Sequence, residues 1–476
     1  MTRPNILWIC TDQQRYDTLG CYGNEAVRTP NIDRLASRGV RFGSCFSQSP
    51  LCTPSRASFL TGRYPRTTRC RQNGQAMPAD EVLVTKLLAD TGYTCGLSGK
   101  LHISPCNPSV CPSVEPRIAD GYSMFHWSHH PMPDWPTNEY LRWLHEKGAR
   151  FETAPLNGSR YVQRGMPAEL NQTTWCAQMA INFIEASARF DTPWLFSVNM
   201  FDPHHPFDPP AEYIQRYLDK LDDVPLPNYV PGELDDKPEF QRRDHLGAYD
   251  RPGWFAYPDM SPEDHRLIRA SYWAMCDLID EQVGRMLDAL DRTGQLDNTL
   301  VIFTSDHGEM LGDHGIYLKG AYFYEPAIRV PLIVAGPGIA SGVTSDALVE
   351  LMDLAPTLLD AAGEPRYPGM QAKSLWPILT GAADPSQHRD DVYCEYYNPH
   401  TYKDAQITMV RTDRHKIAVC HGLRTGELYD LAADPNEIRN LWSDPEYAGV
   451  KAEMIERVMD RMAWTVDPLP ERVAFW

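Results

Sequence analysis

The sequence of 476 residues contains no apolar run long enough to cross a membrane or to form the core of a signal peptide. Near its start, the apolar stretch ILWIC has only five residues and is followed closely by Asp12. We therefore expect a soluble, cytoplasmic protein with no membrane partner.

The chain also has fewer basic than acidic residues. The chain has 45 lysine and arginine residues against 63 aspartate and glutamate residues, which gives a net charge of −18. Such an acidic chain is poorly suited to bind nucleic acid or an anionic membrane surface. It could bind an anionic substrate only where basic side chains gather at one site.

Closely paired cysteines are missing as well, and so are internal repeats. The 12 cysteines are scattered, and the closest pair is Cys106 and Cys111, in a loop rich in proline and serine. A structural zinc site needs about four ligands, and the sequence offers no second pair. We therefore expect reduced thiols.

What the chain does contain is an alternation of buried strands and helices. Continuous apolar runs predict strands at 5–10 and within 93–102, 193–207, 299–309 and 330–338. Helical spacing of apolar residues predicts helices at 29–39, 80–92, 262–292 and 346–363. This order predicts an α/β fold with a large mixed, mostly parallel sheet sandwiched by helices.

The pattern changes near Asp384, where short strand-like runs separated by turns lead into a final helix. We expect residues 1–383 to form the main α/β domain, with an irregular insertion at about 103–170. Residues 384–476 should form a smaller α+β lobe built on a short antiparallel sheet.

Polar side chains follow the predicted strands, and in open α/β sheets ligands bind beyond the carboxyl ends of the strands. Among these side chains, Asp12, Asp306 and His307 predict a divalent-cation site, for which oxygen donors favour Ca²⁺, Mg²⁺ or Mn²⁺. The same edge gathers cationic and imidazole groups, which suit a tetrahedral oxyanion: Lys100, His102, His204, His205 and Lys319.

Two stretches stand out as motifs: CTPSR at Cys52–Arg56, with the pattern Cys-x-Pro-x-Arg, and GYTCGLSGKLH, which ends in Lys100 and His102. They resemble the first and second signatures of the type I, formylglycine-dependent sulfatases of the alkaline phosphatase superfamily. The resemblance continues through CTDQQ, DPHHPF, SDHGEMLGDHGIYLKG and ELYDLAADPNEIRNL, so it covers nearly the whole chain in the expected order.

The resemblance implies a Cα-formylglycine made from Cys52 by a separate maturation enzyme. Its hydrated aldehyde attacks sulfur, and loss of a proton from the second hydroxyl then releases sulfate. A divalent metal, Ca²⁺ by default, is bound by Asp12, Gln13, residue 52, Asp306 and His307. Arg56 orients the diol, Lys100 contacts sulfate, His102 is the base, and His204 and Lys319 flank the leaving oxygen, one of them as general acid.

Two departures from the family pattern concern the metal. Gln13 stands where the family often has a second aspartate, and His307 where many members have asparagine, which lowers the negative charge around the metal and admits Mn²⁺ or Mg²⁺. Both features are similar to choline sulfatases and phosphonate monoester hydrolases. Asn73 stands where those relatives have a substrate-binding asparagine.

Three functions stay open at this point. The first is hydrolysis of a small-molecule sulfate monoester, with promiscuous cleavage of phosphoesters. The second is a phosphonate monoester or phosphodiester hydrolase, in which hydroxyl-bearing residues replace the lysine and histidine that are intact here at Lys100 and His102. The third is a non-catalytic anion- or metal-binding protein with an unmodified Cys52. The sequence leaves the alcohol of the substrate and homo-oligomerisation open.

Overall fold

The computed structural model describes residues 3–131, 135–397, 402, 405–472 and 474. An eight-stranded mixed sheet forms its centre. The β2–β9 and β8–β9 pairs are antiparallel and the other neighbours are parallel, which confirms the predicted mixed, mostly parallel sheet. From edge to edge, the strands are β10 (Val343–Glu350), β2 (Gly39–Phe46), β9 (Arg329–Ala335), β8 (Thr299–Ser305), β1 (Asn5–Thr11), β7 (Trp194–Asn199), β3 (Thr94–Gly99) and β4 (Tyr122–Trp127).

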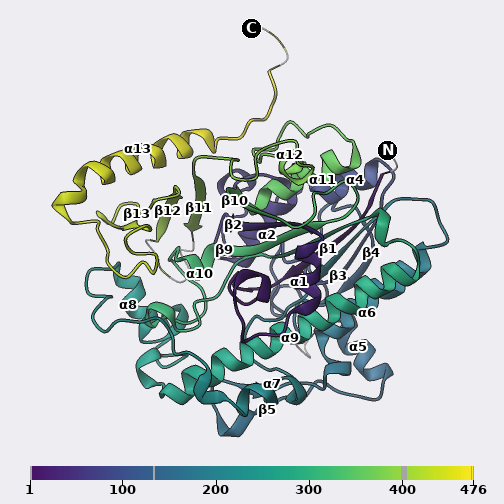
Figure 1. The fold of residues 1–476 in the computed structure, drawn as a ribbon, viewed down its shortest axis with the longest axis horizontal. Coiled ribbons are helices and arrows are strands. Elements are labelled where there is room, and N and C mark those ends of the chain that lie inside the picture. Colours follow the sequence, from purple (N-terminus) through teal and green to yellow (C-terminus); the bar gives the residue numbers. More distant parts are fainter. Residues whose placement is uncertain (1–2, 132–134, 398–401, 403–404, 473, 475–476) are drawn as a thin grey trace.

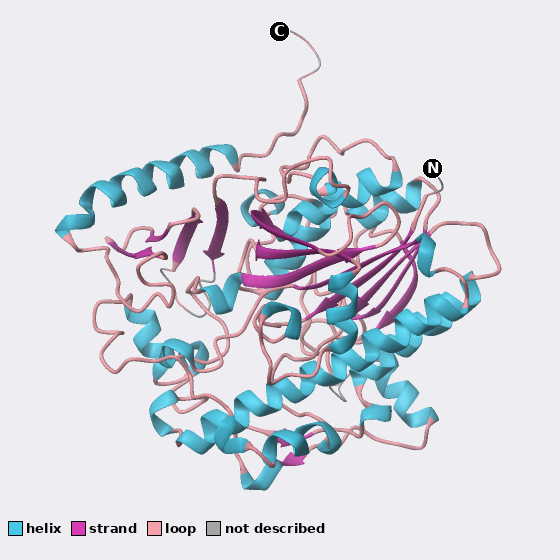
Figure 2. Ribbon diagram, in the orientation of Figure 1, coloured by secondary structure: helices cyan, strands magenta, loops and turns pink. Residues whose placement is uncertain are grey.

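Helices cover both faces of this sheet (Figure 2). Because successive side chains of a strand point to opposite faces, β1 buries Ile6 and Trp8 on one side and Leu7 and Ile9 on the other. The first pair packs in a core with α2 (Cys52–Thr61), α4 (Val84–Asp90) and α11 (Leu354–Ala362). The second pair packs in a core with α1 (Pro30–Ser37), α6 (Gln172–Ser187) and α9 (Pro262–Arg292).

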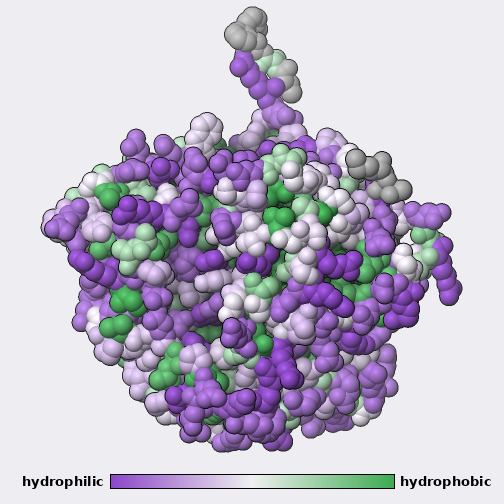
Figure 3. Space-filling view, viewed as in Figure 1, coloured by the Kyte–Doolittle hydropathy of each residue, from purple (hydrophilic) through white to green (hydrophobic). Residues whose placement is uncertain are grey.

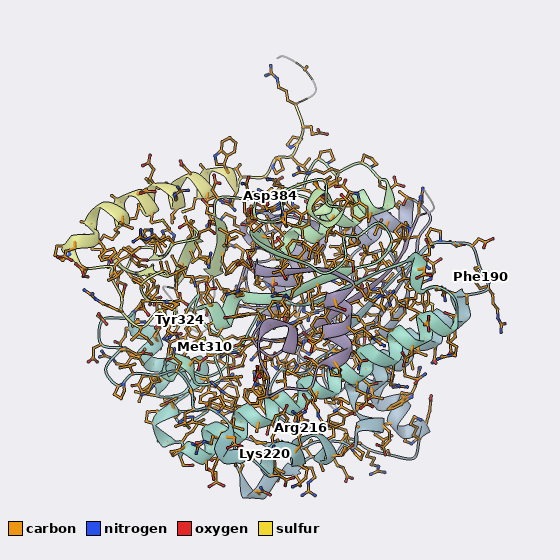
Figure 4. All side chains as sticks on the ribbon, in the orientation of Figure 1. Phe190, Arg216, Lys220, Met310, Tyr324 and Asp384 are labelled. Carbon is orange, nitrogen blue, oxygen red and sulfur yellow. The ribbon has the colours of Figure 1, made fainter. Side chains whose placement is uncertain are left out.

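A second, four-stranded antiparallel sheet lies toward the C-terminus, beside the main sheet (Figure 1). Met310 and Tyr324, labelled in Figure 4, belong to the apolar core that joins this sheet to the main domain. The strands are β11 (Val392–Tyr397), β12 (Gln406–Arg411), β13 (His415–Cys420) and β14 (Thr425–Asp430), and α13 (Ala448–Trp464) packs on them.

The described residues form six further α-helices. They are α3 (Pro65–Thr68), α5 (Glu139–Glu146), α7 (Ala211–Leu218), α8 (Glu239–His245), α10 (Glu325–Ile328) and α12 (Trp376–Leu379).

Two predicted elements differ from the structure. The helix predicted at 346–363 begins only at Leu354, because residues 343–350 pair with β2 as an edge strand. The stretch 103–170 is not irregular throughout, because it contains β4, which pairs with β3 in the main sheet.

The face seen in Figure 3 is mostly hydrophilic, with apolar residues scattered over it. Within the described part of the chain, no helix is both long and apolar enough to cross a membrane.

Candidate active site

Four neighbouring strands, β8, β1, β7 and β3, run parallel and end at the same edge of the sheet. Asp306 directly follows β8, Asp12 follows β1 and Lys100 follows β3, while His204 lies a few residues beyond β7. The topology therefore brings together residues that are almost 300 positions apart in the sequence.

Four potential metal ligands meet at this edge. Ligand atoms of Asp12, Cys52, Asp306 and His307 all lie within 4.8 Å of one another, and the four side chains are buried. Nδ1 of His307 lies 2.9 Å from the carbonyl oxygen of Gly308, to which it donates. The lone pair of its Nε2 therefore faces Asp12 and Cys52, as a metal-binding imidazole requires.

Gln13 adds an oxygen that has no partner. Its Nε2 donates to Glu309, and its Oε1 is buried without a hydrogen bond. The Gln13 backbone N–H lies 3.0 Å from Oδ1 of Asp306, so the residue adjoins the potential metal ligands. A buried oxygen without a donor is costly unless something else satisfies it. The orphaned oxygen, two carboxylates and an imidazole together fit a divalent cation.

Three cationic side chains surround these potential ligands: Arg56, Lys100 and Lys319. Nε of Arg56 donates to Oδ2 of Asp306 at 2.8 Å, and the Arg56 guanidinium also binds the Lys100 carbonyl at 2.9 Å. Nζ of Lys100 pairs with Asp12. Burial alone would raise the pKa of the Asp12 carboxyl, but Lys100 and the other nearby cations hold it well below its usual range.

Cys52 is the first residue of α2 and lies among the same cations. Its Sγ lies 2.8 Å from Nζ of Lys319 and 3.1 Å from Nε2 of His307. Burial and Asp12 raise the pKa of the thiol, yet Lys100, Lys319 and His307 outweigh them and lower it to about 7. The surroundings of this residue therefore stabilise negative charge on it.

Asn73 lies at the start of the same helix. Its Oδ1 accepts the backbone N–H of Thr53 at 3.0 Å, which satisfies one of the N–H groups that the first turn of a helix leaves free. The structure thus places Asn73 next to residue 52, where it supports the helix start.

His102 and His204 are uncharged at neutral pH. Burial, with a further contribution from Lys100, lowers the pKa of His102 well below its usual value. Burial and then Lys319 do the same for His204. Nδ1 of His204 donates to the carbonyl oxygen of His205, so the lone pair is on Nε2.

Two buried glutamates in this region were not predicted from the sequence. Glu115 accepts the backbone N–H groups of His102 at 2.9 Å and Ser104 at 3.1 Å. Glu309 accepts the N–H groups of Leu311 and Leu318 in addition to the Gln13 amide. They hold the segments that carry His102 and Lys319.

The family comparison agrees with this geometry. The sequence pattern of the sulfatase family matches residues 4–364, and that of the C-terminal region of N-sulphoglucosamine sulphohydrolase matches residues 312–463. An uncharacterized sulfatase of Escherichia coli is 31% identical over 98% of this chain and 89% of its own. A choline-sulfatase of Rhizobium meliloti is 32% identical over 93% of this chain and 83% of its own.

Among solved structures, a phosphonate monoester hydrolase from Silicibacter pomeroyi is similar over 98% of this chain and 96% of its own, with a TM-score of 0.85 and 26% sequence identity. The match of the family pattern extends over most of the chain and includes every strand that delivers a side chain to the site. The chain therefore belongs to the sulfatase family, within the alkaline phosphatase-like superfamily, and is a sulfuric ester hydrolase.

Proposed function

We propose that this enzyme hydrolyses small-molecule sulfate monoesters with residue 52 as a Cα-formylglycine and with one divalent metal ion. The observation that carries the proposal is the placement of Cys52, which is buried at the start of α2 in contact with Lys319 and His307 and close to Asp12. A nucleophile at this point faces both the potential metal ligands and the cations that a sulfate group needs.

In this proposal, Asp12, Gln13, Asp306 and His307 hold the metal together with residue 52. When bound, the ion would supply positive charge beside the attacking oxygen. The three oxygen-bearing ligands favour Ca²⁺, while the imidazole of His307 also suits Mn²⁺ and is compatible with Mg²⁺.

The hydrated aldehyde of residue 52 would supply one hydroxyl for attack on sulfur and a second whose deprotonation releases sulfate. The remaining steps belong to the surrounding side chains. His102, uncharged because of its lowered pKa, can accept that proton. Arg56 is fixed by Asp306 and orients residue 52. Lys100 binds the sulfate oxygens, and Asn73, which contacts the backbone of Thr53 next to residue 52, is a further substrate-binding group.

We assign the role of general acid to Lys319. His204 is uncharged at neutral pH, and its only ring proton is already donated to the His205 carbonyl. The ammonium of Lys319 lies 2.8 Å from Sγ of Cys52 and has protons to donate to the leaving oxygen. His204 then contacts the substrate through the lone pair of Nε2.

The proposal is tested by intact-mass measurement of the purified protein combined with assays on 4-nitrophenyl sulfate and choline sulfate. We expect active protein to show replacement of the Cys52 thiol by an aldehyde, and the Cys52→Ala variant to be inactive. Active protein with an unmodified thiol would contradict the formylglycine and the maturation enzyme that it requires. Samples expressed with and without such an enzyme provide the matched pair.

Phosphonate monoester hydrolysis is the second candidate, because the structure from Silicibacter pomeroyi has a closely similar fold. Lys100 and His102 are both present and buried here, and this pair favours the sulfate ester. Phenyl phosphonate and phosphodiester substrates, assayed beside the sulfates, decide between the two. We expect the sulfates to give the higher kcat/KM, with slower phosphoester cleavage.

A further inference from the structure

A second cluster of metal-binding side chains lies next to the active site. Ligand atoms of His102, Cys106 and His129 all lie within 4.8 Å of one another. His102 and Cys106 come from the loop after β3, and His129 follows β4, the neighbouring strand. The sequence showed no second cysteine pair near Cys106, but the fold supplies two imidazoles instead.

The two histidines of this cluster have nitrogens without partners. Nδ1 of His102 and Nε2 of His129 are buried and accept or donate no hydrogen bond. The imidazole rings meet edge to face, with their centroids 4.5 Å apart. Buried polar atoms normally have a hydrogen-bond partner, so two imidazole nitrogens without one, in histidines that cluster with a thiol, indicate a missing ligand. A metal ion would satisfy both lone pairs at once.

Glu115 supplies negative charge beside this cluster. It is fully buried, and it accepts backbone N–H groups from the segment that joins His102 to Cys106. This charge offsets part of the repulsion that Lys100 would exert on a cation. Cys106 is half-buried, whereas the two imidazoles are buried, so the thiol is the most exposed of the three side chains.

We propose that His102, Cys106 and His129 form a Zn²⁺ site separate from the site of Asp12, Asp306 and His307. Two imidazoles and a thiolate are ligands that zinc prefers, whereas Ca²⁺ and Mg²⁺ prefer oxygen. The nitrogen and sulfur ligand atoms around a tetrahedral zinc ion lie about 3.3–3.6 Å apart, so any two ligand atoms of the cluster have to approach each other by about 1.5 Å at most. Cys106 releases its proton to solvent on binding, and water completes the coordination.

Zinc at this site would inhibit the enzyme. If Nδ1 of His102 binds the metal, the ring proton has to be on Nε2, and the imidazole can no longer accept a proton from the substrate side. This consequence, unlike the zinc site itself, rests on the role proposed for His102 as the base.

The site is tested by Co²⁺ titration of the metal-free, full-length Cys52→Ala protein. In this background Cys52 cannot supply a thiolate, so a thiolate-to-cobalt charge-transfer band reports on other cysteines. We expect one band that Zn²⁺ abolishes by competition. Cys106→Ser should remove the band. His129→Gln removes a ligand and should weaken Co²⁺ binding by at least about 100-fold. Loss of a group that only hydrogen-bonds to a ligand already weakens metal binding by about 10–100-fold.

Cys21→Ser is the matched control, because Cys21 is also half-buried but lies outside the cluster. This variant should keep the band. The proposal is overturned if the Cys52→Ala protein shows no such band, or if the band survives Cys106→Ser.

Turnover of the mature enzyme separates the zinc site from the role of His102. We expect Zn²⁺ to inhibit the wild-type enzyme more strongly than the Cys106→Ser variant, with the catalytic metal in excess. Zinc binding through Cys106 without this difference would support the site and contradict His102 as the base.

Discussion

Glu309 controls which way the Gln13 amide points, and this makes the proposed role of Gln13 as a metal ligand testable. One Glu309 oxygen accepts the N–H groups of Leu311 at 3.0 Å and Leu318 at 2.6 Å, while the other accepts the Gln13 amide. In Glu309→Gln the first oxygen can remain, but an NH₂ group replaces the second. Two amide nitrogens then face each other, and the Gln13 amide has to rotate so that its oxygen accepts.

The rotation turns the NH₂ group of Gln13 toward the place where its free oxygen was, and a cation cannot bind an amide nitrogen there. Loss of an interaction that orients a ligand typically weakens metal binding by about 10–100-fold, or about 1.4–2.7 kcal/mol. We expect Glu309→Gln to lie in this range. The fold should remain, because the substitution keeps the size of the side chain and both backbone contacts.

The assay is competition for the metal between the enzyme and a chelating indicator, with turnover measured at saturating metal. Glu395→Gln, which neutralises a buried glutamate paired with Arg66 at 2.6 Å in the C-terminal lobe, controls for the general effect of such a change. Adding Gln13→Glu to Glu309→Gln should restore affinity, because a carboxylate can accept from the new amide and still offer an oxygen. Unchanged affinity in Glu309→Gln would refute Gln13 as a ligand.

Three further outcomes follow from the same geometry. Lys100→Met should lower kcat/KM by about 10²–10³-fold with unchanged circular dichroism, since it removes one preorganised donor; near-normal turnover would exclude Lys100 from sulfate binding. The lowered pKa of His102 keeps its base form present as pH falls, so the acidic limb of kcat/KM should lie well below pH 6.5; a limb near pH 6.5 would identify another base. Exhaustive chelation should abolish activity, and full activity without metal would remove the assigned ligands from the mechanism: Asp12, Asp306 and His307.

Elements with local signals could be predicted well. Helix α9 occupies Pro262–Arg292 as predicted, because Ser261 and Asp264 form a capping box at its start. Strand β10 could not be distinguished from a helix, since Ala347, Leu348 and Val349 are consecutive apolar residues that fit either element. Pairing with β2, about 300 residues away in sequence, decides the outcome.

The residues of the candidate site also differ in whether a local signal in the sequence predicts them. Asp12, Asp306 and His307 directly follow apolar strands, so their convergence could be predicted from the parallel order of the sheet. Glu115 and Glu309 act through backbone N–H groups whose positions depend on the folded loops. No spacing of residue types in the sequence marks such a contact.

The burial of Cys52 would set a time limit on the proposed conversion of this residue to formylglycine. Cys52 is 1% exposed to solvent in the folded protein, so the maturation enzyme of our proposal would have to act before the fold closes. Closure requires β8, which ends at Ser305 and pairs with β1 beside the site. At about 5–20 residues per second, the ribosome needs roughly 10–50 s to pass from residue 52 to that strand. Under this proposal, the fraction of active enzyme would be set by a competition between conversion and synthesis, and slower translation of this interval would raise it.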